Sequence, residues 1–243
     1  MFFLWFREKS YLCTMIQVEI CTPSRKSAEA AKEGGAQRVE LCRELSCGGL
    51  TPCDEDIDFC VRMLGLRTHV LVRPRAGDFS YTPSEMAEIE HSVLRCKELG
   101  AAAVVVGFLT AEGKVDVEFT RRMVQLAAPM EVTFHRAFDE AKQDPVEALK
   151  AVAACGCHRL LTSGQKPTAI EGSEVIRLLN EESKKLKVKI LAGSGVTPAN
   201  VRELIETTGV GEVHGSCKVS LPDGTVQTDA ELVRQLIDNI SDL

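Results

Sequence analysis

The sequence has no run of basic residues, no long apolar stretch and too few cysteines for a disulfide scaffold. Acidic residues outnumber lysine and arginine by 35 to 29, for a net charge of −6, which argues against nucleic acid as a partner because such surfaces cluster cations against phosphates. No stretch approaches the roughly 20 apolar residues of a membrane span, so we expect no membrane partner. Ten cysteines in 243 residues fall below the roughly 8–10% of a disulfide scaffold. The cysteines are scattered along the chain, which favours a reducing compartment. We expect the cytoplasm, with the nucleus as a further location.

Three further absences each disfavour a class of protein or of site. No GxGxxG motif follows the first apolar run, which disfavours a doubly wound dinucleotide-binding sheet. No CxxC pair supplies the ligands of a structural zinc site. No lysine is expected on the inner face at the carboxyl end of a strand, since Lys189 begins one strand and Lys218 follows the last. A Schiff-base aldolase is therefore disfavoured.

The chain does contain eight short apolar runs that alternate with helical segments. The runs are residues 16–21, 38–42, 69–73, 103–107, 132–135, 159–162, 188–192 and 212–216. A capping side chain followed by proline marks three helix starts, at Thr82-Pro83, Asp144-Pro145 and Thr197-Pro198. This alternation, in a chain near the roughly 250 residues usual for the fold, predicts a single (β/α)8 TIM-type barrel of the α/β class over residues 15–243.

Residues 1–14 do not follow the barrel pattern. The apolar run from Phe2 to Phe6 is shorter than the roughly 7–15 residues of a signal-peptide core and leads directly into charged residues. We expect a short N-terminal extension that is disordered or weakly docked. Met15 is a candidate alternative start.

Two of the runs have nearly the same sequence, Val18-Glu19-Ile20-Cys21 and Val39-Glu40-Leu41-Cys42. In each, a carboxylate and a thiol lie on the face opposite the apolar residues. Helices cover the outer face of a closed parallel barrel, so the apolar residues should point outward and the other face should point into the barrel. Glu19, Cys21, Glu40 and Cys42 are therefore expected to meet near its mouth.

The same alternation predicts which residues of the other strands lie inside. His69 and His158 open their strands and are assigned to the N-terminal end, whereas active sites lie at the carboxyl ends. The expected interior site consists of Glu19, Glu40, Arg73, His135 and His214, ringed by Cys21, Cys42 and Ser216. Unpaired buried ions cost several kcal/mol each, and aliphatic side chains would fill a barrel more cheaply, so we interpret the cluster as functional.

These segments resemble the motifs of the CutC copper-homeostasis family. The resemblance runs from about Met15 to the end of the chain, and the Arg-Pro-Arg and His-Arg-Ala-Phe-Asp blocks are specific to it. The segments are residues 18–21 (VEIC), 39–42 (VELC), 45–52 (LSCGGLTP), 72–79 (VRPRAGDF), 133–139 (TFHRAFD), 161–164 (LTSG) and 212–214 (EVH). Departures from the family pattern are Ala76, Phe108 and Cys217.

The resemblance implies a cytosolic barrel that is often a homo-oligomer, handles copper and, in some members, binds Cu(I). The family's copper cysteines correspond to Cys21 and Cys42. The residues agree with that chemistry, because soft thiolates select Cu(I) and adjacent strands lie roughly 4.8 Å apart. The same closeness would also permit a disulfide.

An alternative from a different class is an enzyme that acts on a small anionic metabolite, with phosphorylated compounds among the candidates. In this hypothesis His135 is the general acid or base, Glu19 or Glu40 is its partner and Arg73 holds the anion. The chemistry would be of the lyase, isomerase or hydrolase type. Residues assigned to assist in anion binding are Arg75, Gly193, Gly195 and His214, because barrel phosphate sites use loops after the seventh and eighth strands.

Overall fold

The computed structural model describes residues 16–222 and 224–243. The predicted N-terminal extension, residues 1–14, lies outside this part of the chain. Eight parallel strands form a closed barrel, each paired with the next along the chain and the last with the first. They are β1 (Gln17–Thr22), β2 (Arg38–Leu41), β3 (Arg67–Leu71), β4 (Ala103–Val106), β5 (Glu131–Phe134), β6 (Arg159–Thr162), β7 (Lys189–Gly193) and β8 (Glu212–Gly215).

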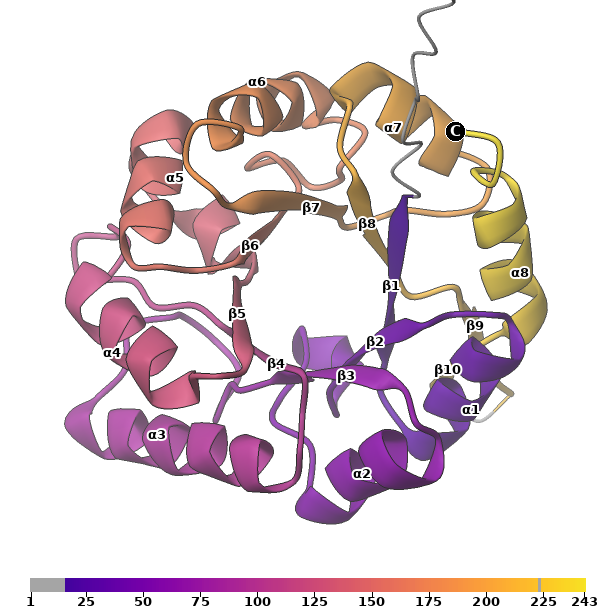
Figure 1. Cartoon of the computed structure of the whole chain (residues 1–243), viewed down its shortest axis with the longest axis horizontal. Coiled ribbons are helices and arrows are strands. Elements are labelled where there is room, and N and C mark those ends of the chain that lie inside the picture. Colours follow the sequence, from indigo (N-terminus) through magenta and orange to yellow (C-terminus); the bar gives the residue numbers. More distant parts are fainter. Residues whose placement is uncertain (1–15, 223) are drawn as a thin grey trace, which may run out of the picture.

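Helices surround the barrel as an outer ring (Figure 1). They are α1 (Arg25–Glu33), α2 (Asp54–Asp58), α3 (Pro83–Glu98), α4 (Val117–Ala127), α5 (Pro145–Ala154), α6 (Ser173–Ser183), α7 (Val201–Thr208) and α8 (Ala230–Asp238). Shorter elements are the 3-10 helices η1 (Leu45–Cys47) and η3 (Arg136–Glu140), the π-helical segment η2 (Phe59–Met63), and an antiparallel pair, β9 (Lys218–Ser220) with β10 (Val226–Thr228). The predicted (β/α)8 barrel is confirmed.

Two of the three helix starts predicted from proline are confirmed. Thr82 caps α3 with a capping box, and Asp144 accepts hydrogen bonds from two backbone N–H groups of α5. The third prediction was wrong, because α7 begins at Val201. The Asn200 side chain bonds the Thr197 N–H and the Gly195 carbonyl, which holds residues 197–200 in a turn before the helix.

The core has two parts, as the alternation along the strands predicts. Apolar residues such as Ile20 and Val70 are fully buried between the barrel and the helices. A separate small cluster inside the barrel contains Cys21, Cys42, Leu71 and Val105. Burying one aliphatic side chain stabilises the fold by about 1.5–3 kcal/mol, so the outer layer sets the orientation of each strand and directs the opposite face inward.

Strand β3 differs from its predicted bounds in a way that matters for the site. It begins at Arg67 and pairs Glu40 of β2 with His69. His69 therefore lies in the middle of the strand and is fully buried, so the prediction that it opens the strand was wrong. The apolar pattern did not indicate this earlier start because Thr68 is polar. Its buried hydroxyl is tolerated in the strand because it donates a hydrogen bond to the Leu66 carbonyl.

Within the described ranges, no helix combines the length and apolar character needed to cross a bilayer.

Candidate functional site

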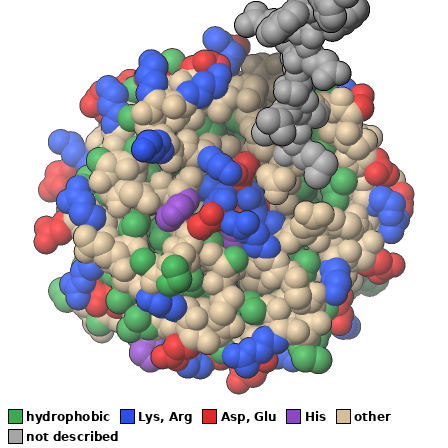
Figure 2. Space-filling model, viewed as in Figure 1, with side chains coloured by type: hydrophobic (Ala, Val, Ile, Leu, Met, Phe, Trp, Pro, Cys, Tyr) green, Lys and Arg blue, Asp and Glu red, His purple; other side chains and the backbone are tan. Residues whose placement is uncertain are grey.

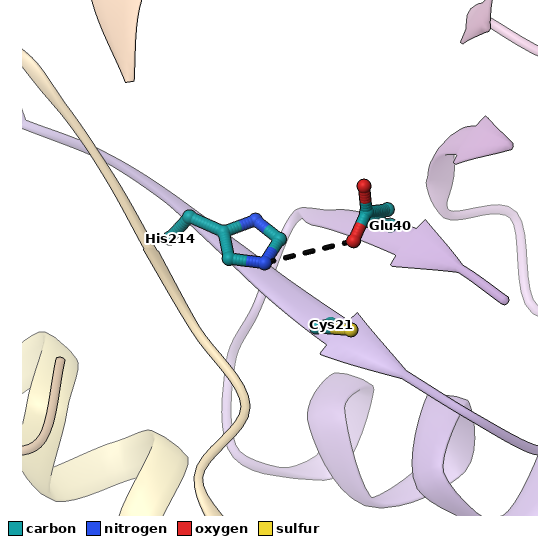
Figure 3. A group of neighbouring side chains, drawn as sticks. All are labelled: Cys21, Glu40 and His214. Carbon is teal, nitrogen blue, oxygen red and sulfur yellow. Dashed lines mark ion pairs between the residues drawn. The ribbon is translucent and has the colours of Figure 1, made fainter. Parts of the chain in front are cut away.

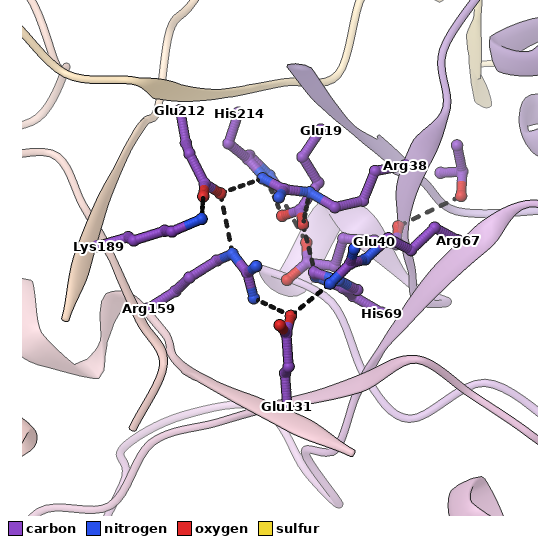
Figure 4. A network of polar contacts seen from close by, with 11 residues as sticks. Glu19, Arg38, Glu40, Arg67, His69, Glu131, Arg159, Lys189, Glu212 and His214 are labelled. Atoms are coloured by element: carbon purple, nitrogen blue, oxygen red, sulfur yellow. Dashed lines mark hydrogen bonds and ion pairs between the residues drawn. The ribbon is translucent and has the colours of Figure 1, made fainter. Parts of the chain in front are cut away.

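Ion pairs fill the N-terminal end of the barrel interior (Figure 4). Glu212 Oε2 lies 2.7 Å from Arg38 Nη2 and 2.9 Å from Arg159 Nε. Arg159 Nη1 also lies 2.6 Å from Glu131 Oε2, which Arg67 contacts at 2.6 Å. On the face shown in Figure 2, basic and acidic side chains gather over the centre of the barrel. Because these charges neutralise one another, we interpret this layer as structural.

Glu19 connects this layer to the mouth of the barrel. Its Oε2 atom lies 2.9 Å from Arg38 Nε and 2.7 Å from His69 Nδ1, and its Oε1 atom is hydrogen bonded to His214 Nδ1 at 2.9 Å. Burial opposes ionisation, but His69, His214 and Arg38 outweigh it and hold the pKa of Glu19 well below its ordinary value. Glu19 is thus a buried, ionised anchor for both histidines.

Potential metal-ligand atoms meet nearer the mouth (Figure 3). One atom each from Cys21, Glu40 and His214 lies within 4.8 Å of the others, and His214 Nε2 is 3.6 Å from Glu40 Oε2. The Sγ atoms of Cys21 and Cys42 are 3.8 Å apart. The strand register explains the meeting, because Cys21 pairs with Glu40 across β1 and β2, and Glu19 pairs with His214 across β1 and β8.

Burial and neighbouring charges shift the protonation of this cluster. The hydrogen bond with Cys42, together with burial, raises the pKa of the Cys21 thiol well above its ordinary value. Burial raises the pKa of Glu40, an effect that His214 only partly offsets. Burial opposes charge on His214, but Glu40, Cys21 and Glu19 outweigh it and raise the pKa of this imidazole. A metal that took these donors as thiolate and neutral imidazole would displace protons.

The cluster opens into a cavity of about 760 Å³. Cavities of roughly 300–1,000 Å³ are typical of small-molecule sites. Residues in its lining include Cys21, Glu40, Cys42, Arg73, Phe79, His135, Arg136, Asp139, Ser194, Gly195, His214, Ser216 and Cys217. The four donor residues therefore share one cavity with the predicted Arg73 and His135.

Arg73 and His135 do not join the ion pairs around Glu19. Among the described residues, Arg73 bonds backbone carbonyls, and His135 Nδ1 accepts the Ala137 N–H at 3.0 Å as the cap of η3. The acid–base pairing expected between His135 and Glu19 or Glu40 is therefore not formed here, and Glu19 pairs with His214. Strand order explains this, because β5, which ends before His135, lies across the barrel from β1.

The remaining residues predicted to bind an anion lie in different places. Arg75 is bonded to Glu85 at 2.5 Å and to Asp78 at 2.9 Å, and it does not line the cavity. Gly195 does line it. Gly193 is not among the lining residues, but an added Cβ there would lie 3.1 Å from His214 Cβ and 2.6 Å from a Leu161 methyl, so glycine leaves space for the imidazole.

Sequence reasoning missed several interior residues that the alternation could have found. Arg38 lies two residues before Glu40, and Arg159 lies two residues before Leu161, so both share the inward face of their strands. His69 precedes the inward-facing Leu71 by the same step. Phe79 carried no such signal, because it lies in a loop.

Fold and site together define a class of protein: a (β/α)8 barrel with a thiol, carboxylate and imidazole cluster where its first, second and eighth strands end. The chain matches the model of the CutC family over residues 16–219 and belongs to that family.

Relatives of known name agree with this membership. A CutC family protein of Chromobacterium violaceum is 45% identical over 201 residues, covering 83% of this chain and 81% of the relative. One of Porphyromonas gingivalis strain ATCC 33277 is 37% identical, covering 92% and 97%.

Solved structures agree on the fold. The crystal structure of a copper homeostasis protein CutC from Streptococcus agalactiae has a TM-score of 0.78 at 31% identity, covering 83% of this chain and 99% of that one. A phosphoribosylanthranilate isomerase from Thermotoga maritima, at 16% identity and a TM-score of 0.62 with 94% and 100% covered, shares the barrel fold alone.

Proposed function

We propose that this protein binds Cu(I) through Cys21 and Cys42 and serves copper homeostasis. The observation that carries the proposal is the 3.8 Å separation of the two Sγ atoms in the lining of one cavity. Thiolates are soft ligands that select Cu(I) over harder cations. The name of the solved Streptococcus agalactiae relative supports the same cargo.

His214 and Glu40 extend the donor set. The imidazole Nε2 atom is a borderline donor that suits copper or zinc, whereas the Glu40 oxygen suits harder ions. Four protein donors would also serve Zn²⁺. Zinc is therefore the competitor from which the experiment must distinguish copper.

Glu19 supports this site through its contact with His214. Metal-ligating histidines commonly donate their second ring nitrogen to a carboxylate, which fixes the tautomer and the ring orientation. The 2.9 Å contact between His214 Nδ1 and Glu19 Oε1 has this form and leaves Nε2 toward Cys21 and Glu40. We assign Glu19 as a positioning residue.

A competition titration against a Cu(I) chelator under reducing, anaerobic conditions tests the proposal, with Zn²⁺ titrated in parallel. The wild type should take Cu(I) from the chelator, and a Cys21→Ser/Cys42→Ser variant should not. Cys53→Ser is the control, because it also removes a thiol, but from an exposed position that does not line the cavity. Equal Cu(I) affinity of the wild type and the first variant, or tighter binding of Zn²⁺ than of Cu(I), would refute the proposal.

We also propose the cytoplasm as the compartment, with the nucleus as the second candidate, and a homo-oligomer as the assembly. Support for a reducing compartment comes from the cysteines of the described residues, which are all free. Light scattering on the purified protein tests the assembly, since a monomer mass would contradict it.

The acid–base enzyme remains a second candidate because of one observation. The cavity of about 760 Å³ is much larger than a single ion requires and has the size of a small-molecule site. Turnover of a small anionic compound that is lost in His135→Asn would support this function.

A further inference from the structure

Arg73 is a buried cation with no carboxylate partner among the described residues. It is 6% exposed. The two other buried arginines of the barrel, Arg38 and Arg159, each contact carboxylates within 3 Å. A buried charge without a counter-ion costs several kcal/mol. The position of Arg73 in the cavity lining therefore favours an anion supplied from outside the chain.

The guanidinium of Arg73 is held in place by backbone carbonyls. Nη1 donates to the carbonyls of Cys47 at 3.0 Å and Gly49 at 3.2 Å, and Nη2 donates to that of Gly77 at 2.8 Å. The Nε atom is buried and forms no hydrogen bond with a carboxylate or a carbonyl of the described residues, and Tyr81 is the polar side chain that interacts with Arg73. These carbonyls accept three hydrogen bonds from Arg73, which has five N–H donors, and they orient the cation, but none of them carries a negative charge.

His135 presents an unpartnered donor in the same cavity. Its Nδ1 atom accepts the Ala137 N–H, so the proton of the neutral imidazole is on Nε2. Nε2 is buried and has no acceptor within the described ranges, and the residue is 5% exposed. Burial, with the charges of Arg73 and Arg136, lowers the pKa of His135 to about 3. The ring is thus neutral at physiological pH.

Phe79 contacts both of these groups, and two glycines leave space for them. The Phe79 ring centroid lies 4.9 Å from the Arg73 guanidinium carbon and 4.9 Å from the His135 ring centroid. A Cβ added at Gly107 would lie 2.3 Å from His135 Nδ1, and one added at Gly48 would lie 3.0 Å from Arg73 Nη1. Donors that are already oriented lose little entropy when a ligand arrives.

We propose that Arg73 and His135 form a binding site for the carboxylate or phosphate group of a small organic molecule. Arg73 supplies the charge and His135 Nε2–H a directional hydrogen bond, a combination suited to an oxyanion. Arg136 also lines the cavity, but Asp139 pairs with it at 2.8 Å, so Arg73 is the cation that remains for the ligand. The site is distinct from the thiol cluster and does not depend on copper binding.

Thermal unfolding of the full chain with inorganic phosphate or acetate tests this site. Reductant and a metal chelator are present, and chloride keeps the ionic strength constant. The wild type should show a saturable rise in Tm with at least one of the two anions, and the anion that binds more tightly identifies the preferred group.

In His135→Asn, which retains a capping side chain, and in Arg73→Lys, the apparent affinity for the anion should fall about tenfold or more. Arg122→Lys is the control, because Arg122 is an exposed arginine of α4 that does not line the cavity, so this change should leave the affinity unchanged.

Two further measurements separate this proposal from a purely structural role and from the copper proposal. In wild-type protein, the ¹H–¹⁵N NMR signal of His135 Nε2–H should shift saturably with the same anion and not with chloride. Anion affinity should persist in Cys21→Ser/Cys42→Ser. The proposal is overturned if neither anion gives saturable stabilisation of the wild type, if the variants bind as tightly as the wild type, or if the Nε2–H signal does not move.

Discussion

His214 Nδ1 lies 2.9 Å from Glu19 Oε1, where β8 pairs with β1 and closes the barrel. The two residues are 195 positions apart in the chain. The bond directs the other ring nitrogen of His214 toward Glu40, 3.6 Å away, and toward Cys21. Closure of the barrel therefore also assembles the candidate metal site.

Glu19→Gln should weaken Cu(I) binding while every proposed ligand remains. The amide is neutral and holds the His214 ring less firmly, and loss of such a supporting contact typically costs about 10–100-fold in metal affinity. The chelator competition measures the change. Glu131→Gln is the control, because it also removes an ion-paired carboxylate, in this case the partner of Arg67 and Arg159 at the N-terminal end of the barrel. Unchanged Cu(I) affinity in Glu19→Gln would contradict the positioning role.

Gly107→Ala should destabilise the fold by about 1–3 kcal/mol through overpacking. The added Cβ would lie 2.3 Å from His135 Nδ1 and 2.9 Å from the Ala137 side chain, and the Gly107 backbone is not in the left-handed region, so the steric contact is the cause. Urea unfolding measures the change. Gly211→Ala, whose Cβ has no heavy atom within 4 Å in the described structure, should change stability little. Equal effects of the two substitutions would show that His135 is not packed as described.

His135 should make stability fall as the solution becomes acidic. Its folded-state pKa, about 3, is below the unfolded value of about 6.5. Between these values the unfolded chain binds a proton that the native state does not. The contribution of the neutral His135 ring to the free energy of unfolding is therefore fully present above pH 6.5. It decreases toward pH 3, by at most about 1.4 kcal/mol per pH unit. Arg73 and Arg136 are the charges that face the ring.

Denaturant unfolding at a series of pH values measures this effect. The difference between the wild type and His135→Asn isolates His135 from the other titrating groups. The free energy of unfolding of the wild type should fall more steeply between pH 6.5 and 4. Parallel curves for the two proteins would mean that His135 titrates normally in the folded state.

Oxidised glutathione should join Cys21 and Cys42 in a disulfide. The two thiols lose two protons and two electrons, and the glutathione disulfide takes them up to give two glutathione molecules. The short Sγ separation and the cavity lining favour this product. Mass spectrometry of the peptides that contain these cysteines detects it, and prior loading with Cu(I) should protect them. Glutathione adducts confined to the exposed Cys47 and Cys53 would contradict the prediction.

Much of the fold followed from patterns that are local in sequence. Apolar residues such as Ile20 and Leu41 alternate with polar ones, and this period defines which face of each strand packs against helices. Thr82-Pro83 and Asp144-Pro145 mark helix starts because capping requires only neighbouring residues. The same patterns predicted that Glu19, Glu40 and His214 would point inward, as they do.

The partners of those inward residues required the closed structure. Alternation predicts which way a side chain points but not which side chain it meets, since that depends on strand order and register around the barrel. Thus Glu19 meets His214 and His69, whereas His135 lies across the barrel with Arg73. The sequence by itself determined the barrel and the inward face of its strands. Only the tertiary structure decided that these side chains form two separate sets, one around His214 and one around Arg73, because contacts between distant strands exist only once the barrel closes.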